Sequence, residues 1–286
     1  MSYRQITFAE RYTVALLRQQ GLSAAAIARV LGRHRSTIGR EVRRNQGRSD
    51  GAYRPQLADW SPEQIAGRLR RQGRLHISHE TIYRWIWADK AVGGTLYRHL
   101  RGARKQRRKR YGAYDSRGRL AGKRPITSRP PGAHHRARLR HWEGDTLLGA
   151  GQAGPCVVTL VERKSGFLLV GKLARRTAPF VNQRLHHLIQ QQPRPVRTIT
   201  VDNGTEFHSY VALEQRVPTR FYFATPHHAW ERGTNENTNG LLRQYLPKGV
   251  SMAHLTQYDC NRIATKLNRR PRKRLGYRTP EECYVP

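Results

Sequence analysis

Acidic residues, cysteines and long hydrophobic runs are all scarce in this sequence. Its 286 residues include 19 Asp and Glu against 54 Lys and Arg, which gives a formal net charge of +35. Such an excess repels itself unless a polyanion or counterions compensate it, so nucleic acid is the leading candidate partner. An anionic membrane surface is the alternative. However, no apolar run approaches the ~18 residues of a spanning helix and the basic stretches lack one wide apolar face, so we expect no membrane partner.

Two further absences narrow the class of protein. The N-terminal residues MSYRQITFAERY contain no apolar signal core, so we expect a cytoplasmic protein. Cys156, Cys260 and Cys283 are far apart and in no CxxC pair, which predicts ordinary buried thiols rather than a disulfide scaffold or a zinc knuckle. Histidine pairs also lack the i, i+4 spacing of a zinc site, and one pair, His227 and His228, is a candidate DNA contact.

The N-terminal residues are predicted to form a helix-turn-helix. In FAERYTVALLRQQG, the residues at helical spacing are Tyr12, Ala15, Leu16 and Gln19. Ser23 is the candidate N-cap of a second helix that ends near Gly32, and Ser36 is the candidate cap of a third helix that runs to Arg44. Two short helices across a glycine turn, the second of them basic, are typical of the motif, and a helical hairpin with a solvated basic face is the alternative.

The third helix supplies the predicted base and backbone contacts, because a recognition helix lies in the major groove of DNA. We expect these contacts from Arg35, Ser36, Thr37, Arg40, Arg43 and Arg44.

A second pair of helices and a basic stretch follow. In SPEQIAGRLRRQGRLHISHETIYRWIW, Ser61 is the candidate N-cap of one helix and Ser78 that of the next. This pair is interpreted either as a second DNA-binding unit or as a purely structural one. Residues 101–140 contain fifteen Lys or Arg and one acid, Asp115. This composition suits a linker that lies along phosphates, or a solvated disordered run.

From His141 onward the pattern predicts a mixed α/β sheet. Three strand-like runs, WEGDTLLG, GPCVVTLVER and SGFLLVGKLAR, are separated by short polar breaks that suit antiparallel hairpins. A helix is expected over Thr177–Gln191, with its apolar face formed by Phe180, Leu185, Leu188 and Ile189. VRTITVD and TRFYFA are predicted strands, whereas GTEFHSYVALEQR and TNENTNGLLRQYL are predicted helices. Antiparallel strands followed by alternating helix and strand indicate a mixed sheet.

Three carboxylates are candidates for chemistry in that sheet. Asp145 lies in the first predicted strand, Asp202 follows the fourth, and Glu236 lies on the late helix. Because α/β sheets bind ligands at the carboxyl ends of parallel strands, we expect the three acids to meet there, with Asn203 and Gly204 turning the chain away. Converging acids repel one another unless a cation lies between them, and hard oxygen ligands select Mg²⁺ or Mn²⁺. Two such ions can activate a nucleophile and stabilise the leaving oxygen of a phosphodiester.

Each acid also has a structural alternative. Asp202 before Asn-Gly suits a turn, and Glu236 suits the positive end of a helix dipole. For Asp145 no structural role is evident if its strand is central, because burying an unpaired carboxylate is energetically unfavourable. Glu143 shares the strand face of Asp145, and we interpret it as a structural or supporting residue.

The surroundings of Glu236 give further expectations. Positions three, four and seven after it share its helix face. We expect Asn239 to bind the acid or the substrate, Gly240 to leave room for a DNA backbone, and Arg243, with Lys248 beyond it, to hold phosphates. Asn235 and Asn237 are expected to face loops or solvent.

Four stretches resemble the catalytic core of transposases of the insertion sequence 30 family, within the ribonuclease-H-like integrase superfamily. They are HWEGDTLLG, TITVDNGTEF, YFATPHHAWERGTNENTNGLLRQYLPKG and LNRRPRKRLGYRTPEE. LSAAAIARVLGRHRSTIGREVRRN resembles the family's N-terminal helix-turn-helix, and WSPEQIAGRL through ISHETIYRWIW its second helical unit. The resemblance implies that Asp145, Asp202 and Glu236 are the metal-binding catalytic acids, with Glu236 lying 34 positions after Asp202.

The resemblance also implies an organisation and an activity. The expected segments are a helix-turn-helix domain at 1–48, a connector at 49–59, a second helical unit at 60–100, a basic linker at 101–140 and a ribonuclease-H-like catalytic domain at 141–286. The connector is shorter than in the family, which bears on whether the two DNA-binding units can reach their separate sites.

We expect a bacterial, nucleoid-associated transposase with two Mg²⁺ or Mn²⁺ ions. It would act on double-stranded DNA, at inverted-repeat ends and target sites, as a homodimer or higher homo-oligomer. Two rivals stay open. One is a non-catalytic helix-turn-helix regulator, or decayed copy, and the other is a structure-selective nuclease of the same fold.

Overall fold

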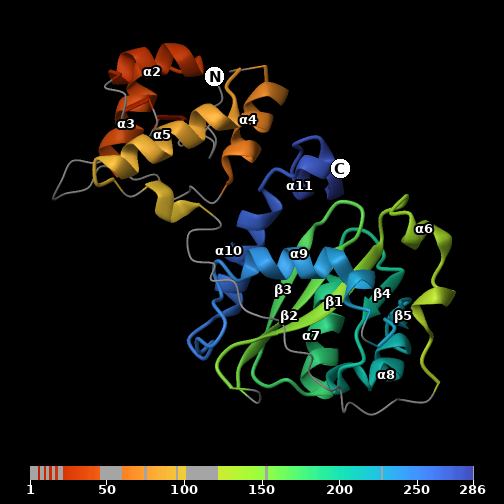
Figure 1. Ribbon diagram of the computed structural model, residues 1–286. Helices are drawn as coiled ribbons and strands as arrows, with labels where there is room; N and C mark the ends of the chain where they lie inside the picture. Colours follow the sequence, from red (N-terminus) through yellow and green to blue (C-terminus); the bar gives the residue numbers. More distant parts are fainter. Residues whose placement is uncertain are drawn as a thin grey trace. The chain divides into compact units, whose positions relative to one another are not determined.

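The computed structural model describes residues 6, 10, 13–14, 17–18, 22–45, 60–73, 76–94, 96–100, 122–151, 154–226 and 228–285 (Figure 1). By internal contacts the chain divides into two compact units. One comprises residues 1–109 with 271–278, and the other comprises residues 110–270 with 279–286. None of the helices that the structure describes is long and apolar enough to cross a membrane.

The helix-turn-helix forms as expected, with one difference at its last helix. α2 (Ala24–Leu31) begins after Ser23, whose hydroxyl accepts the amide hydrogen of Ala26, and it ends at Gly32 in the left-handed conformation. α3 (Arg35–Asn45) begins one residue before the predicted cap. Ser36 therefore lies inside the helix, and its amide donates to Nδ1 of His34. A side chain upstream of the helix has taken the capping role that the sequence assigned to Ser36.

The core of this motif is formed by residues on successive turns of the two helices. Its buried residues are Ile27, Ala28, Leu31, Ile38 and Val42, together with Ile6 and Val14. Of the first predicted helix, the described residues Glu10, Thr13, Val14, Leu17 and Arg18 are helical. Its predicted face residues Tyr12, Ala15, Leu16 and Gln19 lie outside the described part of the chain.

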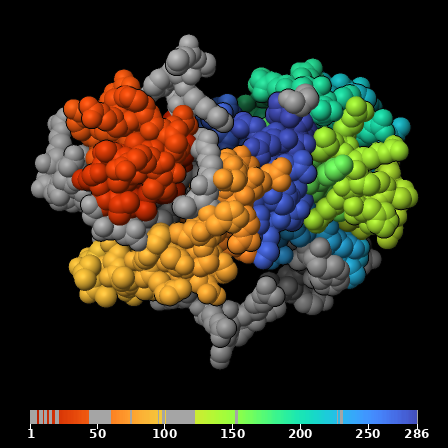
Figure 2. Space-filling view, turned by 90° about the horizontal axis from the view of Figure 1, so that it is seen from above, coloured from red at the N-terminus to blue at the C-terminus, as the bar shows by residue number. Residues whose placement is uncertain are grey.

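The second helical pair also begins at its predicted caps. α4 (Pro62–Arg71) follows Ser61, which forms a reciprocal capping box with Gln64, and α5 (His79–Ala91) follows Ser78. The short 3-10 helix η1 (Leu96–His99) comes after α5. Their described residues form one contiguous group of atoms (Figure 2, orange). It encloses a small core of Ile65, Ala66, Leu69, Ile82 and Ile86.

The second unit contains a five-stranded sheet in the order β3-β2-β1-β4-β5. The strands are β1 (His141–Leu148), β2 (Cys156–Glu162), β3 (Leu168–Leu173), β4 (Thr198–Val201) and β5 (Arg220–Phe223). β1, β2 and β3 pair antiparallel with one another, while β4 pairs parallel with both β1 and β5. The predicted architecture, a mixed five-stranded sheet that follows N-terminal helices, is confirmed, and β1 is the central strand.

Helices cover both faces of the sheet (Figure 1). α7 (Ala178–Gln190) and α8 (Tyr210–Glu214) share one core with Trp142 of β1, whereas α9 (Gly233–Leu242) and α10 (Gln257–Asn268) share another with Leu147. Successive strand residues point to opposite faces, so the odd-numbered residues of β1 face α9. The short α11 (Pro280–Tyr284) adds Tyr284 to the first core.

Two predicted elements differ in part from the structure. In α7, the predicted face residues Leu185, Leu188 and Ile189 are buried, but Phe180 is exposed and Val181 is buried in its place. The helix predicted over GTEFHSYVALEQR is split into η3 (Thr205–Phe207) and α8, because the residues after Asp202 form a turn first. α10 and α11 were not predicted as elements.

The second half of the predicted basic linker is folded onto the sheet. Pro125 bridges to Phe223 at the edge strand, and the 3-10 helix η2 (Ile126–Ser128) and α6 (Pro131–His134) follow. Arg129 is buried and donates to Thr200 Oγ1 at 3.0 Å. Residues 122–140 therefore belong structurally to the sheet, while 101–121 lie outside the described residues.

The cysteines are mostly as expected. Cys156 and Cys260 are fully buried, and burial raises the pKa of each thiol to about 11. Cys283 is only partly buried, and all three are free thiols.

Candidate catalytic site

Two of the predicted acids lie side by side where the parallel pairing of β1 with β4 ends, Asp145 inside β1 and Asp202 directly after β4. β1 and β4 pair in the register Glu143 to Thr200, and Asp145 and Asp202 each follow that pair by two residues. Because neighbouring parallel strands in register place equivalent residues side by side, the two aspartates lie at the same level along the strands. The side chains are 20% and 28% exposed, so both are reachable from solvent.

Arg232 lies between these two aspartates. It ends the 3-10 helix η4 (Ala229–Arg232), directly before α9. Its NH1 is 3.7 Å from Oδ1 of Asp145, and its NH2 is 3.6 Å from Oδ2 of Asp202. The same NH1 donates to the carbonyl oxygen of Gly144 at 3.0 Å, which fixes the guanidinium at the edge of β1. One cation therefore faces both carboxylates.

Asp145 is held by two further hydrogen bonds. The amide of Thr146 donates to Oδ1 at 2.9 Å, and Nδ2 of Asn239 donates to Oδ2 at 2.7 Å. Burial raises the pKa of Asp145 above its ordinary value, Arg232 opposes that rise, and Asp202 adds to it. Asn239 thus binds one of the candidate acids, as the sequence suggested, but that acid is Asp145 rather than Glu236 on its own helix.

Asp202 is held by the turn that follows β4. The amide of Gly204 donates to its Oδ1 at 3.0 Å. Asn203 donates from Nδ2 to the carbonyl of Ala224 at 2.9 Å and accepts from Nζ of Lys123 at 2.8 Å. A Cβ on Gly204 would lie 2.3 Å from a carboxylate oxygen of Glu206 and 3.0 Å from Asp202 Oδ1, so a side chain here would have to displace the Glu206 carboxylate.

Glu236 lies in the first turn of α9, and its side chain is exposed. It borders an open pocket of about 210 Å³, together with Asp145, Arg232, Asn235 and Asn239. Among the described residues, no group of three His, Cys, Asp or Glu side chains is arranged to hold a metal ion. The sequence predicted that the three acids would meet. The structure instead brings Asp145 and Asp202 to one cation, and Glu236 to the rim of the same pocket.

The donor chemistry of this group fits a hard divalent cation. Two aspartate oxygens face a common positive charge, and a third carboxylate borders the adjoining pocket. Oxygen ligands of this kind are those that Mg²⁺ and Mn²⁺ take in proteins. Asp145, Asp202 and Glu236 are the residues that could hold such an ion.

Glu143 fixes α9 relative to the sheet. It is fully buried, its Oε1 accepts from NH1 of Arg163 at 2.5 Å, and its Oε2 accepts from the amide of Asn235 at 2.9 Å. A carboxylate on the first-turn amides of a helix is favoured by the helix dipole. The helix that carries Glu236 is therefore anchored to β1 two residues before Asp145.

Three residues of the site were missed or misplaced from the sequence. Arg232 has one signal, its position one helical turn before Glu236. Asn235 was expected to face loops or solvent, but it is 1% exposed, and its side-chain Oδ1 and Nδ2 have no partner among the described residues. Glu206 is buried and accepts from Thr146 Oγ1 at 2.7 Å, with NH1 of Arg176 at 3.7 Å.

The residues predicted to hold phosphates around α9 have other surroundings. Arg243 donates from NH1 to the carbonyls of Leu148 and Leu246, and burial lowers its pKa. The guanidinium that was expected to hold a phosphate therefore binds main-chain carbonyls at the end of α9. Lys248 and Gly240 are exposed. His228 lies 3.5 Å from Glu231, and His227 lies outside the described residues.

On α3, most of the predicted DNA contacts face solvent. Arg35, Ser36, Arg40 and Arg43 are exposed and Thr37 is partly buried. The side chain of Arg44 lies outside the described part. Their exposure is compatible with the predicted DNA contacts.

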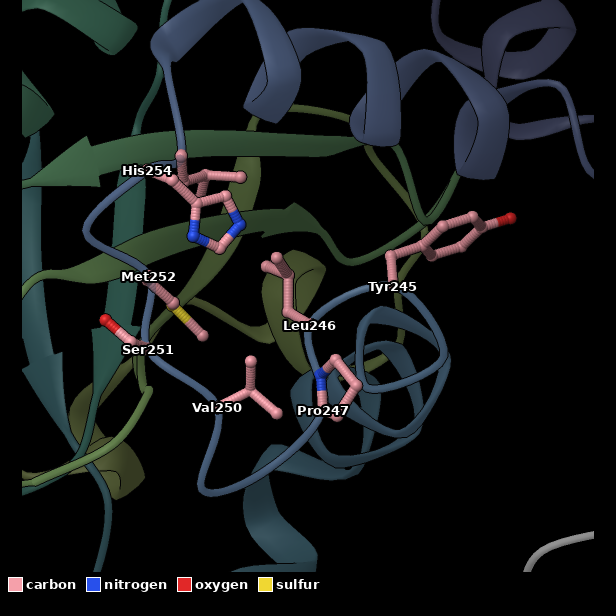
Figure 3. A pocket seen from close by; sticks show the side chains of 8 residues that line it. Tyr245, Leu246, Pro247, Val250, Ser251, Met252 and His254 are labelled. Atoms are coloured by element: carbon pink, nitrogen blue, oxygen red, sulfur yellow. The ribbon is translucent and has the colours of Figure 1, made fainter.

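A second pocket lies on the loop after α9 (Figure 3). It is lined by eight residues that include Leu246, Pro247, Val250 and Met252, whose side chains point toward one another. Its lining is mainly apolar and contains none of the three acids. It is therefore separate from the group around Arg232.

Comparison with known proteins shows similarity to transposases along nearly the whole chain. Residues 2–45 match a family model described as a helix-turn-helix domain. The chain is 36% identical to the transposase for insertion sequence element IS4351 of Bacteroides fragilis, covering 98% of this chain and 95% of that protein. It is 37% identical to the transposase for IS1086 of Cupriavidus metallidurans, covering 97% and 93%. It is 35% identical to transposase InsI for IS30A of Escherichia coli K12, covering 97% and 82%.

These alignments extend over 312, 319 and 317 positions, more than the 286 residues of this chain. The relatives therefore contain internal residues with no counterpart here, which is the direction expected from a short connector. Among solved structures, the catalytic core domain of BIV integrase matches 51% of this chain and 93% of that one, at 21% identity and a TM-score of 0.39.

Proposed function

The chain belongs to the IS30 family of transposases, and we propose that it binds the inverted-repeat ends of its own element and cuts and joins DNA strands with Asp145, Asp202 and Glu236. The observation that supports this most is the placement of two aspartates at one edge of the central sheet, facing a single cation, with Glu236 at the adjoining pocket. Structural reasons alone do not explain two partly buried carboxylates in contact with the same guanidinium.

DNA binding is assigned to the helix-turn-helix and to the overall charge. α3 presents the exposed cations Arg35, Arg40 and Arg43, which suit the major groove and its flanking phosphates. The net charge of +35 supplies a sequence-independent attraction that weakens as salt increases. We therefore expect recognition of the inverted repeats by the first unit and backbone contacts along the rest of the chain.

The chemistry balances as two phosphoryl transfers. In the first, a water oxygen bonds to phosphorus at the element end, and the bond from phosphorus to the 3′ oxygen breaks, leaving a 3′-hydroxyl. In the second, that hydroxyl bonds to the phosphorus of another phosphodiester and releases that strand's 3′ oxygen, which takes up a proton. Mg²⁺ or Mn²⁺, when bound, would activate the attacking oxygen and stabilise the leaving one.

In both transfers, the protein's own residues hold the three acids in place. Asn239 and the amide of Thr146 orient Asp145, and the amide of Gly204 orients Asp202. Glu143 holds the start of α9 and with it Glu236. Two element ends must be handled together, so we also propose a homodimer or a larger homo-oligomer on DNA.

The proposal is tested with labelled DNA that carries the inverted repeats flanking the coding region, in the presence of Mg²⁺ or Mn²⁺. We expect Asp202→Ala to abolish cleavage and strand transfer and to leave repeat binding intact. Asp259→Ala, which removes an acid at the start of α10 rather than at the sheet edge, is the control and should keep both activities. Normal strand transfer by Asp202→Ala would refute the assignment of the acids.

Two other outcomes separate the rival functions. Specific repeat binding without nicking in either metal would indicate a regulator that retains only its DNA-binding part. Cleavage of branched DNA regardless of terminal sequence would indicate a structure-selective nuclease.

A further inference from the structure

The guanidinium of Arg232 occupies the position between the two catalytic aspartates. It approaches Oδ1 of Asp145 at 3.7 Å and Oδ2 of Asp202 at 3.6 Å, and its side chain is 16% exposed. The hydrogen bond from its NH1 to the carbonyl of Gly144 places it there by direct contact with β1. Its position is therefore fixed by two groups on β1 and one in the turn that follows β4.

Two facing carboxylates at this depth require a positive charge between them. Asp145 and Asp202 both approach the one guanidinium of Arg232, and their side chains are only 20% and 28% exposed. Without the guanidinium, the two aspartates would repel each other across a partly dry edge of the sheet. Arg232 thus supplies the compensating charge that a cofactor would otherwise supply.

A guanidinium and a divalent cation cannot share these oxygens. A cation bound by both aspartates would need the carboxylate oxygens that Arg232 faces, and its two charges would repel the guanidinium at contact distance. The two states therefore exclude each other, and the affinity for the cation is reduced by the free energy of the Arg232 contacts.

The adjoining pocket offers a place for the displaced side chain. Arg232 borders it together with Asn235 and Asn239. The amide oxygens Oδ1 of Asn235 and Oδ1 of Asn239 are both buried and accept no hydrogen bond from the described residues. A guanidinium has five N–H donors, so these oxygens are suitable acceptors for it.

We propose that Arg232 is a built-in counter-ion, which holds Asp145 and Asp202 together in the metal-free protein and leaves them when the catalytic cation binds. This role rests on the proposed function, because it takes the two aspartates as ligands of that cation. Arg232 then sets how tightly the site takes its metal, and it keeps the site assembled before the metal arrives.

The test measures Mn²⁺ affinity of the full chain by calorimetry, without DNA, and the melting temperature with and without Mn²⁺. We expect Arg232→Gln to bind Mn²⁺ about three- to thirtyfold more tightly, since it removes two partly exposed ion pairs that each contribute up to ~1 kcal/mol. The melting temperature should fall without metal and recover with it. Arg232→Lys keeps the charge but not the fork, and we expect an intermediate affinity.

The control is Arg262→Gln, which removes an exposed arginine paired with Asp259 on α10 and should leave Mn²⁺ affinity unchanged. Unchanged or weaker Mn²⁺ binding by Arg232→Gln, with binding lost in Asp202→Asn, would overturn the counter-ion role and leave the metal site standing. No Mn²⁺ binding by the wild-type chain or any variant would overturn both the counter-ion role and the metal-dependent function.

Discussion

The buried contact between Glu143 and Arg163 gives the sharpest stability prediction. Glu143 is fully buried, and the side chain of Arg163 is 6% exposed. Replacing Glu143 with Gln keeps the size of the side chain and a carbonyl that can still accept from the amide of Asn235. It removes the negative charge beside Arg163, and Arg129 is a second buried arginine close by, whose pKa burial and Arg163 lower to about 10. The variant therefore leaves two buried cations with reduced compensation.

The expected cost follows from that geometry. Removing one partner of a buried ion pair destabilises a protein by about 3–5 kcal/mol, because the other charge stays buried without compensation. The matched control is Glu281→Gln, which breaks the pair of Glu281 with Arg269 at 3.0 Å, where the side chains are 38% and 54% exposed. A pair so exposed contributes about 0–1 kcal/mol. The loss in the free energy of unfolding should thus be several-fold larger for Glu143→Gln than for Glu281→Gln.

Urea unfolding of the full chain measures the free energies, and hydrogen exchange measures the amides at the start of α9. For Glu143→Gln we expect a lower unfolding midpoint and faster exchange in the peptide that contains Asn235. Both quantities should stay close to wild type in Glu281→Gln. Equal shifts below about 1 kcal/mol in the two variants, with exchange at α9 unchanged, would refute the claim that Glu143 anchors the helix.

Three further predictions concern other parts of the second unit. Burial and nearby arginines lower the pKa of His141 to about 4. The neutral imidazole therefore contributes ~3 kcal/mol to the free energy of unfolding, which is fully present above pH 6.5 and is lost as the pH falls toward 4. His141→Asn should flatten the pH dependence of the melting temperature over that window. A thiol reagent should modify Cys283 first in the native chain, and the two buried cysteines only on unfolding, as mass spectrometry would show. Gly204→Ala should reduce strand transfer at least tenfold by displacing Glu206, whereas Gly233→Ala, where a Cβ meets no atom within 4 Å, should not.

Much of the fold could be predicted because its signals are local. All five strands were found from alternating or β-branched runs, and the caps Ser23, Ser61 and Ser78 mark the starts of their helices. Such features depend on residues a few positions apart, which the sequence shows directly. In α7 only Phe180 was assigned to the wrong side, because helical spacing allows either Phe180 or Val181 at the border of the apolar face, and packing against the sheet buries Val181.

The site was predicted only in part, for a physical reason. From local patterns the sequence by itself placed Asp145 in a strand, Asp202 directly after a strand and Glu236 near the start of a helix, and these places agree with the structure. Only the tertiary structure decided what lies between them. Arg232 reaches two aspartates that are 87 and 30 positions away in the chain, and the amide of Asn235 donates to Glu143 on β1. Contacts of this kind depend on how strands and helices pack, and no local pattern records them.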